Sequence, residues 1–242
     1  MLFRSDLETG AITGAETLVR WVHPLRGIVG PSQFIPIAEE TGLIVQIGEW
    51  GLTEAARQAK IWHSRGYNMK VAVNLSARQF SDPTIVKLVQ DVLERTMLPP
   101  DYLDIELTES TLLQVGKASG ILKQLKGLGV KLSVDDFGTG YSSLAYLKSL
   151  PLDVLKIDKS FVDGLGDDKR SVAVVHALIE LAKGIDAETV AESVETEIQR
   201  EKLAAMGCNA MQGFLVSPAI APDAFERLLI TYNAQVKLRL AA

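Results

Sequence analysis

Two adjacent carboxylates, Asp135 and Asp136, stand at the end of an apolar run from Val130 to Val134. A glycine-containing turn follows them, and Ser142 then predicts the N-cap of a helix. Adjacent carboxylates repel each other unless a cation lies between them. An acidic pair shortly before a glycine is also ordinary turn chemistry. The pair by itself therefore indicates either a turn or one part of a metal site.

Other polar side chains recur at the same place, late in the apolar segments that we expect to be strands. Seven such segments carry them, and two glutamates follow just beyond; the residues are Glu16, Asn74, Glu106, Asp135, Asp136, Lys156, Glu192 and Gln212, then Glu109 and Glu195. In a parallel barrel the C-terminal strand ends share one face, and enzymes with this architecture carry their chemistry there. A solvated rim is the alternative, but the repetition over seven segments favours one shared site.

The donor types define the chemistry of that site. Five carboxylates and an amide are hard oxygen donors, which favour Mg²⁺ or Mn²⁺ over zinc. The three histidines are scattered and do not form a ligand set; they are His23, His63 and His176. Five carboxylates around one site stay ionised only if cations balance them. Two divalent ions about 3.5–4 Å apart, with an aspartate bridging them, would do so and would promote in-line displacement at phosphorus.

Two cationic residues could add positive charge for a phosphate group. Lys156 lies in one of the strand ends, and Arg20 follows Glu16 by four residues. For each of them, an ordinary salt bridge to a neighbouring carboxylate is the alternative interpretation.

The elements that must position these residues alternate between strand and helix. The expected strands are 2–7, 11–22, 70–75, 102–107, 130–135, 153–157, 188–192 and 209–214. The expected helices are 31–40, 43–65, 83–95, 117–128, 142–150, 169–183, 196–206 and 222–229, with Gly129 as a C-cap and 27–31 as a loop. Only three residues separate the first two strands, so these must be antiparallel. The pattern predicts an α/β fold, a modified TIM-type (β/α)8 barrel with the first strand antiparallel.

Composition limits the class of protein. The chain has 242 residues, a net charge of −5 and one cysteine, Cys208. We expect a single domain over 1–242, without a disulfide, in the cytoplasm. A binder of polymeric nucleic acid would usually be basic, so that class is disfavoured. We find no signal peptide and no apolar run that could span a bilayer, so we expect no membrane contact from this segment.

The sequence resembles the EAL-type phosphodiesterases, which hydrolyse the bacterial messenger cyclic di-GMP. The resemblance extends from about Asp6 to about Phe225 and rests on stretches that are specific in combination. They are Glu16–Trp21, Pro31–Pro36, Asn74–Ser76, Glu106–Glu109, Asp135–Leu144, Lys156–Asp158, Ala191–Glu195 and Gln212–Phe214.

The resemblance implies roles for these residues. Glu16, Asn74, Glu106 and Asp135 would hold one metal ion, while Asp135 would bridge to a second ion that Asp136 helps to hold. Glu192 would bind metal or orient water and act as the base, and Lys156 would hold the nucleophilic water. Arg20 would contact the substrate phosphate, with Gln212 and Glu195 in support. Glu109 would steady the loop after Asp136.

The implied reaction opens one phosphodiester bond of cyclic di-GMP to give linear pGpG. It would use two Mg²⁺ or Mn²⁺ ions, with Ca²⁺ as an inhibitor because of its looser coordination. The family also implies a homodimer.

The sequence departs from the family at several positions. Thr17 replaces the signature alanine, and Ser193 replaces the glycine after the base, where a positive φ would strain a serine. Phe214 replaces a tyrosine, an arginine-proline pair is missing near 217–219, and Leu2–Arg4 stand where Tyr-Gln-Pro is usual.

These departures motivate an alternative, a catalytically weak or inactive domain that acts as a cyclic di-GMP receptor or scaffold. A hydrolase of another phosphate ester is a remoter interpretation that two-metal chemistry alone does not exclude.

Overall fold

The computed structural model describes residues 1–114, 119–139, 147, 149–166 and 168–240. The helix predicted over 142–150 and its cap, Ser142, lie largely outside the described residues.

Eight strands close into a barrel. They are β1 (Leu2–Asp6), β2 (Ile12–Thr17), β5 (Lys70–Asn74), β6 (Leu103–Thr108), β7 (Lys131–Phe137), β8 (Val154–Ile157), β9 (Glu188–Ala191) and β10 (Ala210–Gln212). Their order around the barrel is β1-β10-β9-β8-β7-β6-β5-β2. β1 pairs antiparallel with both of its neighbours, and the other pairs are parallel. The predicted barrel with one antiparallel strand is confirmed.

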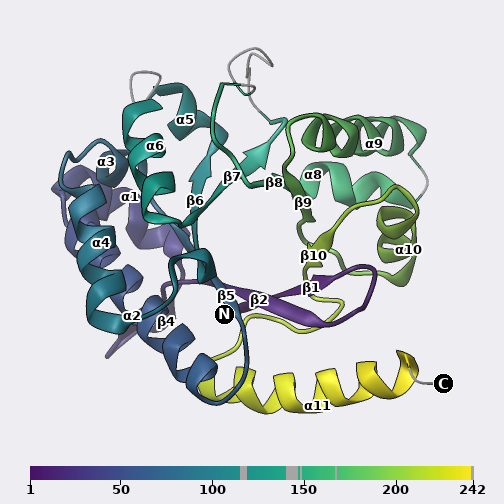
Figure 1. Ribbon diagram of the computed structural model, residues 1–242, viewed down its shortest axis with the longest axis horizontal. Helices are drawn as coiled ribbons and strands as arrows, with labels where there is room; N and C mark the ends of the chain where they lie inside the picture. The colour runs from purple at the N-terminus through teal and green to yellow at the C-terminus, as the bar shows by residue number, and fades with distance from the viewer. Residues whose placement is uncertain (115–118, 140–146, 148, 167, 241–242) are drawn as a thin grey trace.

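Helices surround this barrel (Figure 1). They are α1 (Pro31–Thr41), α2 (Ile44–Ser64), α3 (Ala77–Phe80), α4 (Ile85–Thr96), α5 (Glu109–Gln114), α6 (Ser119–Leu128), α8 (Lys159–Val162), α9 (Lys169–Gly184), α10 (Glu197–Ala205) and α11 (Pro222–Leu240), with 3-10 turns at Pro100–Tyr102 and Asp163–Leu165. Gly129 ends α6 at φ +93°, as predicted for a C-cap. None of the described helices is both long enough and apolar enough to cross a membrane.

The predicted strand over 11–22 is wrong in its second half. β2 ends at Thr17, whose hydroxyl donates to the carbonyl of Ala72, and the chain then leaves the barrel. A separate hairpin follows, formed by β3 (Trp21–His23) and β4 (Gly27–Val29), so the loop predicted at 27–31 is partly strand. Trp21 packs edge-on against Phe34 of α1, a tertiary contact that strand propensity does not report.

The barrel strands alternate between two environments. On β6, Leu103, Ile105 and Leu107 belong to the main apolar core between barrel and helices, while the intervening Asp104 and Glu106 are buried polar residues. Since successive side chains of a strand point to opposite faces, the acids point into the barrel interior. A second small apolar cluster, Val154, Val190 and Ala210, has the same phase as Lys156, Glu192 and Gln212 on β8, β9 and β10. The barrel interior is therefore polar toward the C-terminal strand ends and holds both apolar and polar residues one level below.

The segments after β9 and β10 are held against each other. The N–H of Val194 donates to the carbonyl of Gln212 at 3.0 Å, and the N–H of Leu215 donates to the carbonyl of Val194 at 3.0 Å. Gly213 allows this approach, because a Cβ there would lie 2.3 Å from the Val194 nitrogen and oxygen. The contact fixes the backbone beside Glu192 and Gln212.

We predict that Gly213→Ala lowers the free energy of unfolding by about 1–3 kcal/mol or more, because the new methyl group has to displace backbone atoms. Gly51→Ala in α2 is the matched control, because no heavy atom lies within 4 Å of a Cβ built there. The control should be neutral or stabilising by up to about 1 kcal/mol. Urea unfolding measures both variants, and equal stability of the two would contradict the close-approach account.

Candidate functional site

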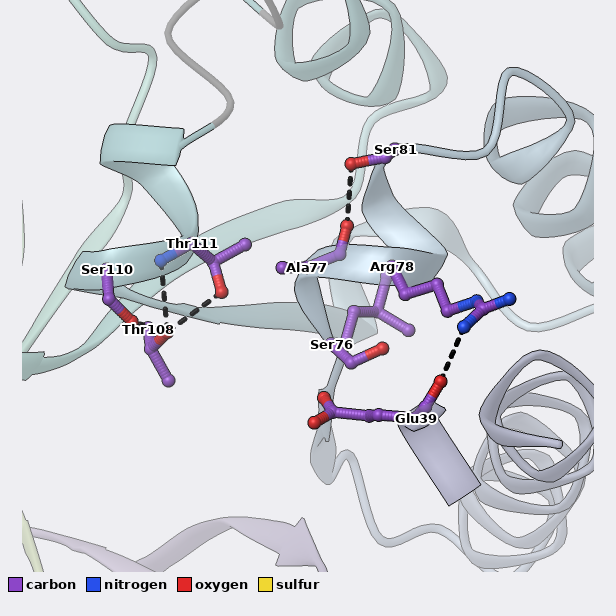
Figure 2. A pocket seen from close by; sticks show the side chains of 9 residues that line it. Glu39, Ser76, Ala77, Arg78, Ser81, Thr108, Ser110 and Thr111 are labelled. Carbon is purple, nitrogen blue, oxygen red and sulfur yellow. Dashed lines mark hydrogen bonds between the residues drawn. The ribbon is translucent and has the colours of Figure 1, made fainter. Parts of the chain in front are cut away.

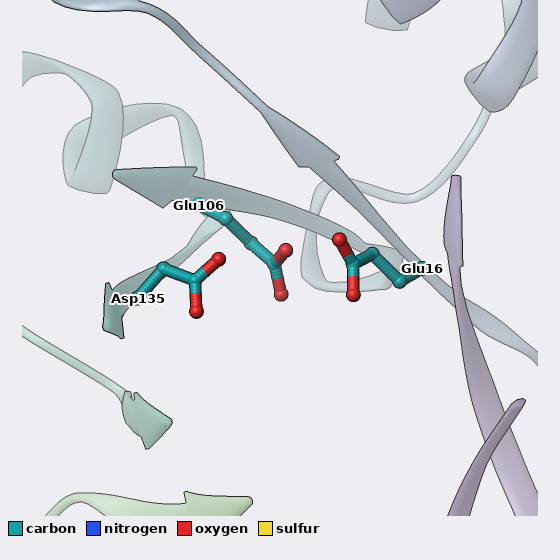
Figure 3. A group of neighbouring side chains, drawn as sticks. All are labelled: Glu16, Glu106 and Asp135. Atoms are coloured by element: carbon teal, nitrogen blue, oxygen red, sulfur yellow. The ribbon is translucent and has the colours of Figure 1, made fainter. Parts of the chain in front are cut away.

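Five carboxylates from four strands or strand ends converge at the C-terminal face of the barrel. Glu16 of β2, Glu106 of β6 and Asp135 of β7 each offer an oxygen within 4.8 Å of the others. Figure 3 shows Glu106 between the other two, with the three carboxylates turned toward a common space. Asp135, Asp136 and Glu192 form a second set by the same criterion. The two sets share Asp135.

Strand register brings these residues together. Asn74 of β5 pairs with Glu106, and Thr108 pairs with Asp135 on the next strand. Asn74 reaches across to β2, where its Nδ2 donates to Oε1 of Glu16 at 2.8 Å. Residues far apart in sequence, such as Asn74 and Glu16 at a separation of 58 positions, thus face one another because each occupies an interior position late in its strand.

Lys156 lies at the centre of the cluster. Its Nζ is 2.7 Å from Glu192, 3.1 Å from Glu106, 3.1 Å from Asp135 and 3.5 Å from Glu16, and its side chain is fully buried. Burial acts to lower the pKa of this ammonium group, but the surrounding carboxylates led by Glu106 outweigh it and hold the pKa well above the usual value. Lys156 therefore does form salt bridges with neighbouring carboxylates, and those carboxylates are the candidate site residues themselves.

Burial raises the pKa of three of the surrounding acids, Glu106, Glu192 and Asp136. Burial raises the pKa of Glu106 to about 8, against the attraction of Lys156 and Arg4. Burial also raises the pKa of Glu192 to about 7, against the attraction of Lys156. Asp136 has a raised pKa from burial and from its neighbour Asp135. The cluster thus holds more negative charge than its own cations neutralise.

Gln212 joins the two carboxylate sets. Its Nε2 donates to Glu16 at 2.7 Å and to Glu192 at 2.8 Å. Its Oε1 is buried and has no hydrogen-bond partner in the described part of the chain. An unpaired buried acceptor costs free energy, so this oxygen indicates a site that accommodates a further donor such as water.

The aspartate pair starts a constrained loop. Asp136 has φ +55°, which aspartate tolerates better than most residues, and its N–H donates to Oδ1 of Asp135 at 2.9 Å. The N–H of Gly138 donates to Oε2 of Glu109 at 2.9 Å. This contact ties Glu109 to Gly138, at the start of the segment after Asp136, and the role of Glu109 in steadying the loop stays a prediction.

Ser193, which stands where the family has a glycine, adopts the positive φ that would strain a serine. Its φ is +53°, in the left-handed region that costs a non-glycine residue free energy. Glu192 nevertheless keeps its contacts with Lys156 and Gln212. The strain is therefore stored in the backbone without moving the carboxylate out of the cluster.

Two of the predicted site residues lie outside the cluster. Arg20 is exposed and donates to the carbonyl of its neighbour Val19, so the structure does not bring it into a salt bridge with the carboxylates. The side chain of Glu195 is 48% exposed and lies 3.4 Å from Lys159 of α8.

Sequence reasoning missed two buried residues beneath the cluster, Arg4 and Asp104. They form an ion pair at 3.0 Å, and Arg4 also pairs with Glu106 at 2.9 Å. The signal that could have found Asp104 is its spacing of two residues from Glu106, which places both on one face of β6.

A pocket of about 730 Å³ opens beside the cluster. Leu75 of its wall follows Asn74 directly, and Thr108 comes two residues after Glu106. The lining residues are Glu39, Leu75, Ser76, Ala77, Arg78, Ser81, Thr108, Ser110 and Thr111. Arg78 donates to the carbonyl of Glu39 on one side, opposite the hydroxyl group of Thr108 on the other (Figure 2). The pocket is large enough for part of a nucleotide-sized ligand and is rich in hydrogen-bonding groups.

The residues fit divalent ions. All donors in the two sets are carboxylate oxygens, the ligands that Mg²⁺ and Mn²⁺ prefer. Burial raises the pKa values of Glu106 and Glu192, and bound cations would offset that cost of ionising them.

The chain is similar to known signalling proteins over most of its length. It is 50% identical over 209 residues to the bifunctional diguanylate cyclase/cyclic di-GMP phosphodiesterase MucR of Pseudomonas aeruginosa, covering 86% of this chain and 30% of MucR. It is 39% identical over 219 residues to the cyclic di-GMP phosphodiesterase PdeR of Escherichia coli, covering 90% of this chain and 33% of PdeR. The chain thus spans about a third of the length of these relatives.

Solved structures agree with this similarity. The PaMucR phosphodiesterase in complex with c-di-GMP has a TM-score of 0.89 and 45% identity, covering 93% of each chain. The EAL domain of Mycobacterium smegmatis DcpA has a TM-score of 0.81 and 34% identity, covering 95% of this chain and 96% of that one. The EAL domain model matches residues 4–219, and with the barrel and its acidic face this shows that the chain belongs to the EAL domain family.

Proposed function

We propose that this domain is a metal-dependent phosphodiesterase that opens one phosphodiester bond of cyclic di-GMP to give pGpG. The observation that carries the proposal is the pair of carboxylate sets that share Asp135 at the C-terminal face of an EAL-family barrel. A relative with 45% identity has been solved in complex with c-di-GMP, which supports the choice of substrate.

Two divalent ions would be held by the two carboxylate sets. Glu16, Asn74, Glu106 and Asp135 would hold one ion, while Asp135, Asp136 and Glu192 would hold the other. When bound, such ions would activate water and neutralise the charge that develops on the phosphate oxygens.

The protein's own groups would complete the reaction. Glu192 would orient the attacking water and accept its proton as the general base, from a position 2.7 Å from Lys156 and 2.8 Å from Gln212. Lys156 stays charged because its pKa is well above the usual value, so it can orient water through an N–H donor and attract the phosphate. Arg20, exposed beyond the end of β2, would approach the phosphate from the rim. The pocket lined by Ser76 and Thr108 would take part of the substrate.

The alternative, a receptor or scaffold without turnover, is less well supported. A domain that only binds cyclic di-GMP has no need of a complete carboxylate set, and every proposed metal ligand is present. The strained Ser193 is the observation in its favour. The preference between Mg²⁺ and Mn²⁺, inhibition by Ca²⁺, the cytoplasmic location and the homodimer stay predictions.

We predict that the wild-type domain converts cyclic di-GMP to pGpG with Mn²⁺ or Mg²⁺ and that Asp135→Asn lowers kcat by well over 100-fold. Changes outside the direct metal ligands already cost about 10–100-fold, and Asp135 is shared by both sets. Chromatography of the products measures the rate. Glu54→Gln, which removes an exposed ion pair with Arg57, is the control and should keep full activity. Absence of pGpG from the wild type at any metal concentration would rule out the proposed reaction.

We predict that Mn²⁺ affinity falls as the pH is lowered from 8 to 6. Glu106, with a pKa of about 8, and Glu192, with a pKa of about 7, are progressively protonated over this range and have to lose those protons to bind a cation. Binding should release about one proton near pH 7.5 and about two near pH 6. Titration calorimetry in buffers of different ionisation enthalpy counts these protons. An affinity that does not change between pH 6 and pH 8 would contradict the raised pKa values.

We predict that Ser193→Gly raises the free energy of unfolding by about 1 kcal/mol, because glycine adopts φ +53° without strain. Because Glu192 already contacts Lys156, kcat should stay within about threefold, or less than about 0.7 kcal/mol in the barrier. Ser193→Ala, which keeps the strain and removes the hydroxyl, is the matched control. A gain of more than tenfold in Ser193→Gly would instead show that the serine impairs the site.

A further inference from the structure

The side chain of Arg4 is buried in the barrel interior. It lies on β1, the antiparallel strand, where a register shift between Arg4 and Ser5 interrupts the pairing with β2. Arg4 itself stays in the regular register that begins with Leu2 opposite Glu16, so its side chain points to the same interior face as Glu16. The residue paired with Arg4 on β2 is Gly14, which has no side chain, and the residue paired on β10 is Gln212. The guanidinium group thus occupies interior space next to a site residue.

The guanidinium group connects two carboxylates of β6. Its Nη1 donates to Oδ2 of Asp104 at 3.0 Å, and its Nη2 donates to Oε1 of Glu106 at 2.9 Å. Asp104 is held in turn by the hydroxyl of Ser133, which donates to Oδ1 at 2.5 Å. All three side chains of the Arg4, Asp104 and Glu106 group are at least nine-tenths buried. Arg4 therefore has a fixed position, defined by two rigid contacts on one strand.

Glu106 is consequently held at both oxygens by different groups. Oε1 accepts from Arg4, while Oε2 lies 3.1 Å from the ammonium of Lys156 inside the carboxylate cluster. With Oε1 occupied, Oε2 is the oxygen that Glu106 presents to the cluster. The planar guanidinium reaches Asp104 and Glu106 at once through two nitrogens held in one plane, as a single ammonium group does not.

A cavity lies on the other side of Arg4. It has a volume of about 210 Å³ and is lined by Arg4 and Asp104 together with residues at the starts of strands, among them Lys70, Lys131 and Glu188. Lys70 begins β5 and Glu188 begins β9, so this cavity lies at the N-terminal end of the barrel, opposite the site. Arg4 and Asp104 separate it from the cluster.

We infer that Arg4 is a positioning residue for the metal site: it fixes the carboxylate of Glu106 from below, so that one defined oxygen is presented to a divalent ion. The inference rests on the proposed function, since it assumes that Glu106 is a metal ligand. Arg4 contacts neither the ion nor the substrate and acts through Glu106.

The test is Mn²⁺ affinity measured by titration calorimetry on the full chain, with melting temperature recorded in parallel. Arg4→Met should weaken Mn²⁺ binding by about 10–100-fold, the usual effect of removing a group that orients a ligand. Arg4→Lys should recover only part of that loss, because a single ammonium group lacks the two-pronged geometry. Lys131→Met is the matched control: it breaks a contact with Asp153 at the N-terminal end and should leave Mn²⁺ affinity unchanged.

A double variant separates positioning from simple charge compensation. If Arg4 only neutralises Asp104, then Arg4→Met combined with Asp104→Asn should restore Mn²⁺ affinity to the wild-type value, and the inference is overturned. If Arg4 orients Glu106, the double variant should recover melting temperature while its Mn²⁺ affinity stays low. Should Arg4→Met and the double variant not fold, Arg4→Lys decides: affinity within twofold of the wild type contradicts the inference, and a larger loss supports it.

The wild type distinguishes this inference from the proposed function. If wild-type protein binds no Mn²⁺ and produces no pGpG, the proposed function itself fails. If the wild type binds Mn²⁺ and Arg4→Met binds it equally well, only the role of Arg4 fails.

Discussion

The structure depends on one electrostatic constraint, the burial of a lysine among carboxylates at the open end of a barrel. Lys156 has no exposed surface and contacts four acids, led by Glu192 at 2.7 Å. Charges buried in this way cost several kcal/mol each unless they are paired with good geometry. The two cationic side chains of the cluster, Lys156 and Arg4, face six carboxylates and leave a formal charge of −4; the acids are Glu16, Asp104, Glu106, Asp135, Asp136 and Glu192. With all six acids ionised, two divalent ions would carry the charge that balances this excess.

The barrel makes that concentration of charge possible. Apolar residues on the outward positions of each strand pack against the helices and form the main core, which supplies most of the stability. The inward positions are then free to hold polar groups, above a small apolar cluster of Val154, Val190 and Ala210. Residues such as Asp136 and Ser193 adopt positive φ values next to the cluster, and the surrounding hydrogen bonds hold them there.

Much of this arrangement could be predicted from the sequence, because it follows from periodicity. A polar residue late in each apolar segment predicts a shared face once parallel strands are inferred, and this brought Glu16, Glu106, Asp135 and Glu192 together correctly. The antiparallel first strand followed from the short connection between β1 and β2.

What sequence reasoning missed depends on tertiary contacts. The end of β2 at Thr17 is set by where the chain leaves the barrel, and the strand pattern continues past that point without a break. Arg4 was not assigned to the interior because the ion pair that holds it there joins it to Asp104, 100 positions away in sequence. The position of Arg20 depends on its side-chain rotamer at an exposed site, which local sequence does not determine.

The most direct measurement of the central claim is anomalous diffraction from crystals grown with Mn²⁺. The charge balance predicts two peaks about 3.5–4 Å apart, one on each side of the Asp135 carboxylate. One peak should be bound by Glu16 and Glu106, and the other by Asp136 and Glu192. No peak at saturating Mn²⁺, with Lys156 still in contact with all four carboxylates, would show that the cluster is neutralised by its own side chains and would contradict the account.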